Sequence, residues 1–346
     1  MRPVVLLRLL LLACGLQAGT ASGAERVRLY VSSAPEQEVQ MGMGRDLARL
    51  IARDAEIDLD VRGVAGTPEA LLRLREASQL QLAFVQSNAA PAYLAATQRG
   101  NSEARKLIDS VRVVAPLHEE EIHFVVRADA TLRNLQDLAE ARINLGPQLS
   151  NAALTVTHLY RRLFGKPIPD SQTNFLPTEE ALVKLITERS VDAVAVVGAR
   201  PVRLLANMKP EARQFVKLLK LDAAHPETAA LRDDYATVTA LAADYPGLIE
   251  ADQPALALRM LLVAAGQGAK SRAALVRFSQ AWCRNFARLQ YEGVPQWGGV
   301  TLGASLAQTG WSASHVATQT LRACIDGVTP PTESCSHEDR VLGLCE

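Results

Sequence analysis

The chain has 346 residues, of which 48% are hydrophobic and 21% charged, and its 37 basic and 37 acidic side chains balance to a formal net charge of zero. This apolar content is enough for a large packed core, which excludes intrinsic disorder and a scaffold held by disulfides alone. The neutral balance, the lack of a basic stretch and the 5% aromatic content argue against a nucleic-acid-binding protein. At about 150 residues per domain, the length predicts roughly two domains.

The chain begins with a pattern typical of a secretory signal peptide. Positive charge at Arg2 and Arg8 precedes a short apolar run, and small residues follow as far as Ala24. The run is too short to span a bilayer, so we expect residues 1–24 to be removed on export and the mature protein to be soluble in the periplasm. One alternative stays open, because Cys14 lies in a segment similar to a bacterial lipobox and its lipidation would anchor the protein.

The first part of the mature sequence alternates between predicted strands and helices. The elements in order are a strand over 27–32, a helix over 38–52, a strand over 57–64, a helix from Thr67, a strand over 80–85, a helix over 89–98 and a strand over 111–115. We expect Thr67 to cap its helix, with Pro68 at the first helical position. This alternation predicts a parallel sheet with helices on its faces.

A second block of alternating elements follows. Strands are predicted over 122–126, 142–145, 173–176, 193–197 and 256–264, and helices over 135–139, 150–164, 179–187, 201–207 and 273–291. Ser150 and Asn151 are expected to begin the second of these helices, and Gly165 to end it. Two such blocks in an exported chain predict an α/β, two-lobed binding protein with two mostly parallel sheets, a hinge and a ligand cleft between the lobes.

The order of the elements also predicts the domain boundaries. We expect lobe one to comprise residues 25–115 and 256–325, and lobe two residues 116–250. Crossings near the two junctions would link the lobes. A cysteine-bearing and irregular tail is expected over 326–346.

Several motifs, taken in order, resemble those of one transport family. They are LQLAFVQSN at 80–88, VVAPLHEEEIHFVV at 113–126, LQDL at 135–138, VGARP at 197–201 and YPG at 245–247. Their order and spacing are similar to those of TAXI-type solute-binding proteins of TRAP transporters, and the likeness covers about residues 25–290. The resemblance implies a periplasmic-binding-protein fold. It also implies a receptor that delivers a small organic anion or amino acid, such as glutamate, to a TRAP-type membrane permease.

The loops expected to face the ligand depart from that family. Its glycine-rich first loop is replaced by residues 32–37, and its Gly-Gly-Ser-x-x-Asn element by residues 65–70 without the asparagine. Its Gln-Ser-Asp turn becomes residues 86–88, and its Gly-Ser-Gly-Thr helix start becomes residues 148–151. The frame is therefore kept, whereas the identity of the family's ligands does not carry over to this chain.

Polar residues at the ends of predicted strands supply the candidate ligand site, since ligands of open α/β sheets bind there against helix N-termini. The candidates are Ser32, Ser33, Gln86, Ser87, Asn88, Ser150, Asn151 and Arg200. We expect a ligand carboxylate to lie between the turn at 86–88 and the helix start at 150–151. The structural alternative is turn chemistry or helix capping for the short polar residues and a surface ion pair for Arg200.

The remaining motifs point away from catalysis and metal binding. The sequence has no nucleophile elbow, P-loop or GxGxxG turn, and the spacing of His118 and His123 is one residue longer than the zincin motif and falls on a strand. We therefore expect no enzymatic activity, no cofactor, no metal and a monomeric protein. A protein of the same fold that senses a ligand and signals to a membrane partner is the alternative function.

The four cysteines beyond the leader form an even set, as expected for two disulfides in an exported protein. They are Cys283, Cys324, Cys335 and Cys345. Four cysteines allow three pairings. We expect Cys283 to pair with Cys324, because both lie on helical stretches, and the other two to close a short loop in the tail.

Overall fold

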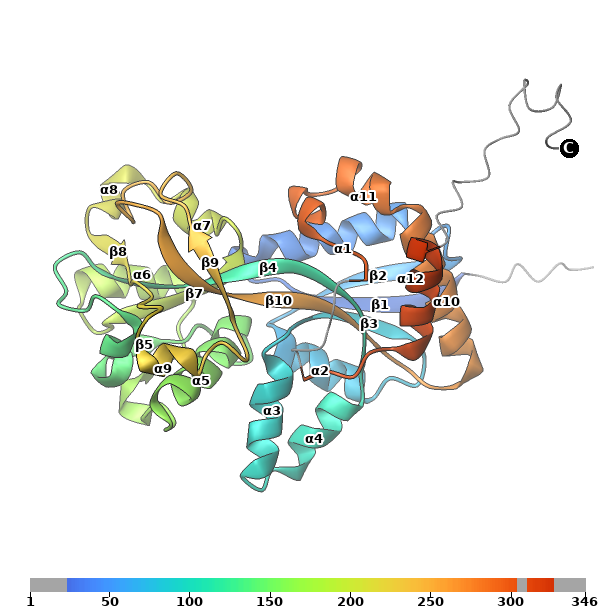
Figure 1. The fold of residues 1–346 in the computed structure, drawn as a ribbon, viewed down its shortest axis with the longest axis horizontal. Helices are drawn as coiled ribbons and strands as arrows, with labels where there is room; N and C mark the ends of the chain where they lie inside the picture. The colour runs from blue at the N-terminus through green and yellow to red at the C-terminus, as the bar shows by residue number, and fades with distance from the viewer. Residues whose placement is uncertain (1–23, 304–309, 327–346) are drawn as a thin grey trace, which may run out of the picture.

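The computed structural model describes residues 24–303 and 310–326. Figure 1 shows two α/β bodies joined by two long strands, β4 (Arg112–Arg127) and β10 (Gln253–Ala265). These crossing strands pair antiparallel with each other over most of their length. The two bodies are therefore connected by a continuous two-stranded ribbon.

The first body contains three strands that extend the sheet from β10. They are β1 (Glu25–Ser32), β2 (Ile57–Val64) and β3 (Gln81–Gln86), and β1 pairs in parallel with the other two. The helices packed around these strands are α1 (Glu38–Leu50), α2 (Thr67–Arg75), α3 (Ala89–Gln98), α4 (Ser102–Asp109), α10 (Gly268–Arg284), α11 (Phe286–Glu292) and α12 (His315–Asp326).

The second body extends the sheet from β4. Its strands are β5 (Ile143–Asn144), β6 (Thr173–Asn174), β7 (Ala193–Ala199), β8 (Val216–Leu218) and β9 (Ala236–Ala240). Its helices are α5 (Asn151–Phe164), α6 (Thr178–Thr187), α7 (Arg203–Ala206), α8 (Pro210–Arg213) and α9 (Pro226–Ala229). Four short 3₁₀ turns complete the described elements. In the first body η1 (Pro35–Gln37) follows β1 and η4 (Pro295–Gly299) follows α11, whereas η2 (Leu135–Glu140) and η3 (Asp170–Gln172) lie in the second body.

The α/β class and the two-body architecture are as predicted, but the sheet differs in one respect. In place of two mostly parallel sheets, a single mixed sheet runs in the order β2-β1-β3-β10-β4-β7-β5-β6. The strands expected separately over 111–115 and 122–126 are one strand, because residues 119–121 between them also pair with β10. The lobe boundaries stay a prediction, since the hydrogen bonding continues across them without a break.

Two local expectations were also wrong. The helix α2 has Gly66 as its N-cap, and Thr67 instead uses its hydroxyl to accept from the backbone N–H of Gln86 at 3.0 Å. The helix expected over 273–291 is divided into α10 and α11 at Asn285, whose side chain donates to the carboxylate of Asp54 (2.8 Å). In both places a contact with a residue distant in sequence decides the local structure.

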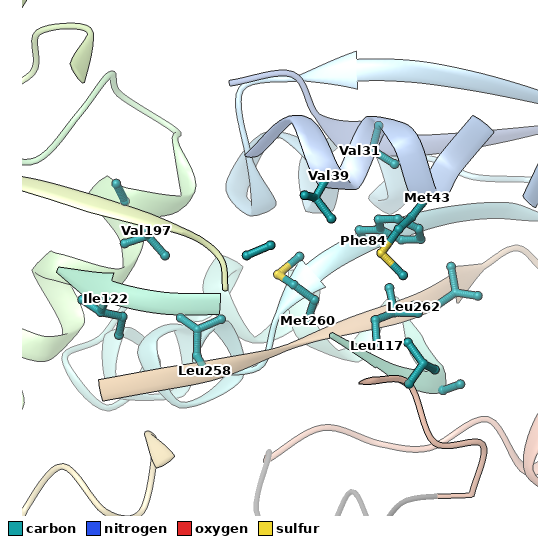
Figure 2. Close-up of a cluster of buried hydrophobic side chains, with 14 of the residues drawn as sticks. Val31, Val39, Met43, Phe84, Leu117, Ile122, Val197, Leu258, Met260 and Leu262 are labelled. Carbon is teal, nitrogen blue, oxygen red and sulfur yellow. The ribbon is translucent and has the colours of Figure 1, made fainter. Parts of the chain in front are cut away.

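The apolar core extends along the crossing strands from one body into the other (Figure 2). Its labelled members are Val31, Val39, Met43, Phe84, Leu117, Ile122, Val197, Leu258, Met260 and Leu262, all at most 9% exposed. Burial of this apolar surface stabilises the contact between the bodies by about 25 cal/mol per Å². It also excludes water from the polar groups beside it.

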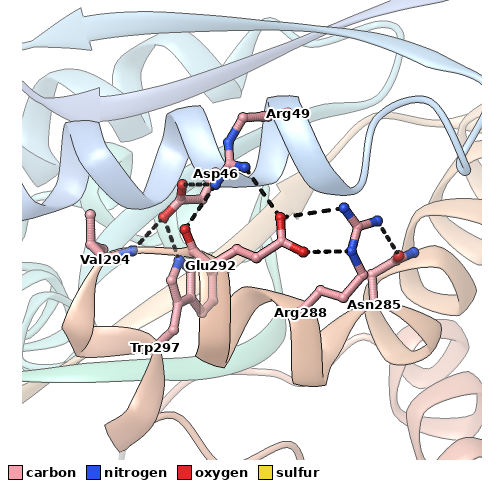
Figure 3. Close-up of polar contacts among 7 residues, drawn as sticks. All are labelled: Asp46, Arg49, Asn285, Arg288, Glu292, Val294 and Trp297. Atoms are coloured by element: carbon pink, nitrogen blue, oxygen red, sulfur yellow. Dashed lines mark hydrogen bonds and ion pairs between the residues drawn. The ribbon is translucent and has the colours of Figure 1, made fainter.

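Polar contacts fix α1 against the later helices of the first body (Figure 3). The carboxylate of Asp46 on α1 accepts from the backbone N–H of Val294 (2.8 Å) and from the indole N–H of Trp297 (3.1 Å). Arg49, one turn further along α1, donates to Asp46 (3.1 Å) and to the backbone carbonyl of Glu292 (3.1 Å). Because η1 and α1 follow β1 in the chain, these contacts hold the segment after β1 in place within the first body.

A disulfide joins Cys283 on α10 to Cys324 on α12, with their Cα atoms 6.3 Å apart, and this confirms the expected pairing. The signal peptide, Cys14, and the expected bridge between Cys335 and Cys345 lie outside the described residues. Within residues 24–303 and 310–326, no helix has the length and hydropathy needed to cross a membrane.

Candidate functional site

Three of the predicted site residues meet where the two bodies touch. Gln86 ends β3 and Asn88 precedes α3 in the first body, whereas Asn151 is the first residue of α5 in the second. Each side chain is at most 1% exposed. The Gln86 side-chain oxygen accepts from the hydroxyl of Thr155 (3.0 Å), and the Asn88 amide donates to Thr155 and to the hydroxyl of Tyr235 (both 3.2 Å). Amide side chains of the first body thus reach into the second.

Asn151 makes the reverse connection. Its side-chain amide donates to the side-chain oxygen of Gln37 (2.7 Å), and its oxygen accepts from the backbone N–H of Thr67 (2.7 Å). The backbones also touch, because a Cβ atom added at Gly66 would lie 2.6 Å from the backbone nitrogen of Asn151. The two bodies are therefore closed on each other at this point.

A buried carboxylate, that of Glu120, lies at the centre of this contact. It projects from β4 and is 0% exposed. One carboxylate oxygen accepts from the side-chain amide of Gln40 (2.8 Å), and the other accepts from the amides of Gln86 (3.1 Å) and Gln37 (3.4 Å). Three neutral amides of the first body therefore surround a carboxylate on the crossing strand.

The next residue, Glu121, points to the second body and has different partners. Its carboxylate bonds the imidazole of His123 (3.0 Å), accepts from the hydroxyl of Tyr245 and pairs with the guanidinium of Arg200 (3.3 Å). Burial, the largest influence, raises the pKa of Glu121, but the bonds from His123 and Tyr245 and the charges of His123 and Arg200 outweigh it, so the pKa lies below its ordinary value. Burial and the neighbouring carboxylate raise the pKa of Tyr245 far above its ordinary value.

Residues 39–270 match the model of the NMT1-like family, which covers more than half of the chain. The chain belongs to the NMT1-like family. No curated protein matches its sequence closely enough to count as a relative.

Several solved structures resemble this NMT1-like protein. They include the periplasmic binding protein BugD, at 11% identity over 87% of this chain and 94% of that chain, with a TM-score of 0.49. The arginine-, lysine- and histidine-binding protein ArtJ from Geobacillus stearothermophilus matches at 15% identity over 80% and 96%, with a TM-score of 0.45. The periplasmic aliphatic sulphonate binding protein SsuA from Escherichia coli matches at 16% identity over 87% and 83%, with a TM-score of 0.41. Likenesses at this level do not bear on the ligand of the NMT1-like protein.

The hydroxyls of the four predicted serines bond backbone groups in the NMT1-like protein. The hydroxyl of Ser32 accepts from the backbone of the turn that follows it (3.4 Å), and that of the exposed Ser33 donates to the last carbonyl of β2 (3.3 Å). The hydroxyl of Ser87 accepts from a backbone N–H of β10 (3.2 Å), and that of Ser150 caps α5 (3.1 Å). Ser32 and Ser150 thus make the turn and capping contacts that were the structural alternative, whereas Ser33 and Ser87 bond strands that are distant in sequence.

Arg200 does not line the contact between the bodies either. It pairs with Glu121 and donates to the backbone carbonyl of Thr239 (2.8 Å); it therefore makes an ion pair, but with a buried carboxylate and not at the surface as the alternative had it. His118 and His123 both lie on β4, where only His123 bonds a carboxylate. Among the residues that the structure describes, no group of three or more His, Cys, Asp and Glu side chains is placed to hold a metal ion.

Sequence reasoning missed several residues of the contact between the bodies. We call the full set the interface network: it comprises Gln37, Gln40, Thr67, Gln86, Asn88, Glu120, Asn151, Thr155 and Tyr235. A signal existed for Glu120, because HEEE at 118–121 interrupts two apolar runs at the predicted crossing. Gln37 and Gln40 follow β1, at a strand end of the kind where ligands of α/β sheets bind. No pattern around Tyr235 marks it.

Two grooves flank the interface network. One, of about 810 Å³, lies between the start of α1 and the turn at Pro201, and an ion pair between Arg203 and Glu38 (2.6 Å) crosses it. The other, of about 180 Å³, lies between α3 and α5, and its lining includes several alanines together with Arg99 and Arg161. Both grooves include residues from the two bodies, so their shape depends on how the bodies are placed.

Proposed function

We propose that this NMT1-like protein is an extracytoplasmic receptor that captures a small organic anion or amino acid between its two bodies. The observation that carries the proposal is the convergence of Gln86, Asn88 and Asn151, which come from strand ends and helix starts of different bodies. A site shared by two bodies on a two-stranded connection opens and closes by rotation about that connection. Such a site encloses a solute and removes it from water, which strengthens its hydrogen bonds.

The finer part of the proposal concerns export and the partner. The leader-like start supports an exported protein, and the order of motifs that resembles TAXI-type proteins supports delivery of the solute to a TRAP-type membrane permease. We propose a monomer with a binding role and no catalytic role. Uptake of the solute into vesicles containing a TRAP permease, measured with and without the purified receptor, tests the partner. Transport that is equal in both arms would contradict it.

Binding itself is tested with the mature chain, residues 25–346. Thermal unfolding is measured against amino acids and organic acids, and affinities of the best binders are then measured by calorimetry. Asn151→Asp should weaken binding, because it removes the amide donor to Gln37 and adds a negative charge. The surface change Lys106→Ala on α4 is the control. A folded protein that no probe stabilises would rule out the receptor function.

One observation favours the alternative, a ligand-sensing protein that signals to a membrane partner. Residues of the interface network hydrogen-bond one another across the closed contact, and Gly66 packs directly on the backbone at Asn151. A form that closes on its own side chains can present a closed surface without a solute. Small-angle scattering of the ligand-free protein distinguishes the two, because a transport receptor is expected to be open without its solute.

A further inference from the structure

The charge of the interface network is unbalanced. The network contains one carboxylate, that of Glu120, and neither arginine nor lysine. Among the residues that the structure describes, no guanidinium or ammonium nitrogen lies within 4 Å of this carboxylate. The imidazole of His118 does lie within that distance, at 3.8 Å. A buried carboxylate without a counter-charge is costly, although bonds from neutral amides lower that cost.

The Glu120 carboxylate cannot leave the site when the bodies move. Its backbone pairs with Leu258 of β10 on one side and with Ala199 of β7 on the other, in the middle of the sheet. The carboxylate therefore stays beside any solute that enters. An organic anion without a positive charge would place its carboxylate next to a fixed negative charge, and no basic side chain of the network would offset the repulsion.

Two buried groups at this contact lack hydrogen-bond partners among the described residues. One is the side-chain oxygen of Asn88, which is 0% exposed and whose amide nitrogen is already used twice. The other is the imidazole of His118, which is 3% exposed and has both ring nitrogens unpaired. Buried polar atoms are nearly always paired, so orphans at a candidate site indicate a missing partner. The Asn88 oxygen needs a donor, whereas the Glu120 oxygens have donors but no counter-charge.

From these observations we propose that the solute carries a positively charged amino group and that Glu120 receives it. This inference rests on the proposed receptor function and selects amino acids over organic acids that lack an amine. The ammonium group would displace one amide from Glu120. The amide of Gln37 is held by the longest of the three bonds, at 3.4 Å, and is the first to be released. The freed amide then donates to the carboxylate of the same amino acid, so donors and acceptors stay balanced.

The test compares amino acids with the same acids lacking the amine, for example L-glutamate with glutarate and L-alanine with propionate. In calorimetry on the wild-type mature chain, at least one amino acid should bind about tenfold or more tightly than its deaminated partner. Glu120→Gln keeps the size of the side chain and removes its charge, and it should reduce that ratio about tenfold or more. Glu119→Gln is the matched control on the same strand, since Glu119 pairs with Arg259 outside the network.

Each outcome has a definite reading. Deaminated acids that bind the wild-type chain as tightly as their amino acids would overturn the inference while leaving the receptor function in place. An unchanged ratio in folded Glu120→Gln would also overturn it. Binding of neither class to the folded wild-type chain would remove the proposed function, and the inference with it. The wild-type ratio is informative even if the variant fails to fold, which circular dichroism checks.

Discussion

Glu120 and Glu121 are neighbours on one buried strand, yet they have opposite surroundings. Glu120 contacts three neutral amides, all from the first body, whereas Glu121 contacts a histidine, a tyrosine and an arginine, all outside that body. Successive side chains of a strand point to opposite faces of the sheet. Glu120 therefore contacts the first body, and its neighbour Glu121 contacts the second. Glu121 has a counter-charge in Arg200, and we expect it to act in stability. Glu120 has hydrogen bonds but no counter-charge, and this makes it the candidate for contact with a solute.

The sharpest way to break this comparison is to remove the Glu121 carboxylate. Glu121→Ala leaves Tyr245, His123 and Arg200 buried or half-buried without their common partner. The free energy of unfolding should fall by about 3–5 kcal/mol, the usual cost of breaking a buried pair from one side. Urea denaturation followed by circular dichroism measures it. A loss below about 1 kcal/mol, the level of an exposed ion pair, would mean that the cluster is not structural.

Separating the bodies should affect the surroundings of Glu120 and spare those of Glu121. Gly66→Ala places a Cβ atom against the backbone of Asn151, at 2.6 Å from its nitrogen, so the closed contact cannot form unchanged. Overpacking of this kind costs about 1–3 kcal/mol, and here it should shift the protein toward an open form. Small-angle scattering should show a larger radius of gyration than in the wild type.

Gly298→Ala is the control for that change, because a Cβ atom there has no neighbour within 4 Å. Its scattering curve should superimpose on that of the wild-type protein. Equal radii for the Gly66 variant and the wild type would show that the bodies do not separate at this contact.

The acid sensitivity of the two positions should also differ. Because the folded-state pKa of Glu121 is lowered, its ionised form stabilises the fold above the unfolded-state value of about 4.3, and this contribution is lost as the pH falls through the folded pKa. Between about pH 5 and pH 3 the wild-type protein should therefore lose more stability than Glu121→Gln. Parallel denaturation curves at each pH measure the difference. Equal slopes would contradict the lowered pKa.

The smallest effect is expected from Glu120→Gln in the absence of solute. The buried charge disappears, and the amide of Gln86 can turn its oxygen toward the new amide, because its present partner, the hydroxyl of Thr155, can accept as well as donate. We expect a change in unfolding free energy within about 1 kcal/mol, which is the net value of an ordinary hydrogen bond. A loss comparable to that of Glu121→Ala would show that both carboxylates are structural and would remove the contrast between them.

Much of the fold could be predicted from the sequence, because apolar periodicity marks elements such as β1, α1 and β2 almost to the residue. The crossing strand β4 was missed as one element, since the polar residues 118–121 interrupt its apolar pattern. Those residues are tolerated inside the sheet because their partners, Gln40 and Tyr245 among them, come from positions far away in the chain. Such pairings leave no local signal.

The candidate site was predicted in part, and side-chain reach explains the division. Topology placed Gln86, Asn88 and Asn151 at strand ends and helix starts, and their amides are long enough to contact the opposite body. The side chains of Ser32 and Ser150 are shorter, and their hydroxyls bond the backbone nearest to them. Residue type and position thus identified the amides, whereas the role of each serine depended on which backbone group lay within reach.

The ribbon formed by β4 and β10 has a mechanical consequence. Two hydrogen-bonded strands resist sliding past each other, because sliding breaks every hydrogen bond between them. They bend and twist at low cost where the pairing is irregular. The register between the two strands shifts between Arg259 and Leu261 and again between Leu262 and Val263. Both irregularities lie on the side of the first body, next to the backbone bond between Ser87 and Arg259. Rotation of the bodies should therefore be concentrated near residues 259–263. The rest of the ribbon should move together with the second body as one rigid unit.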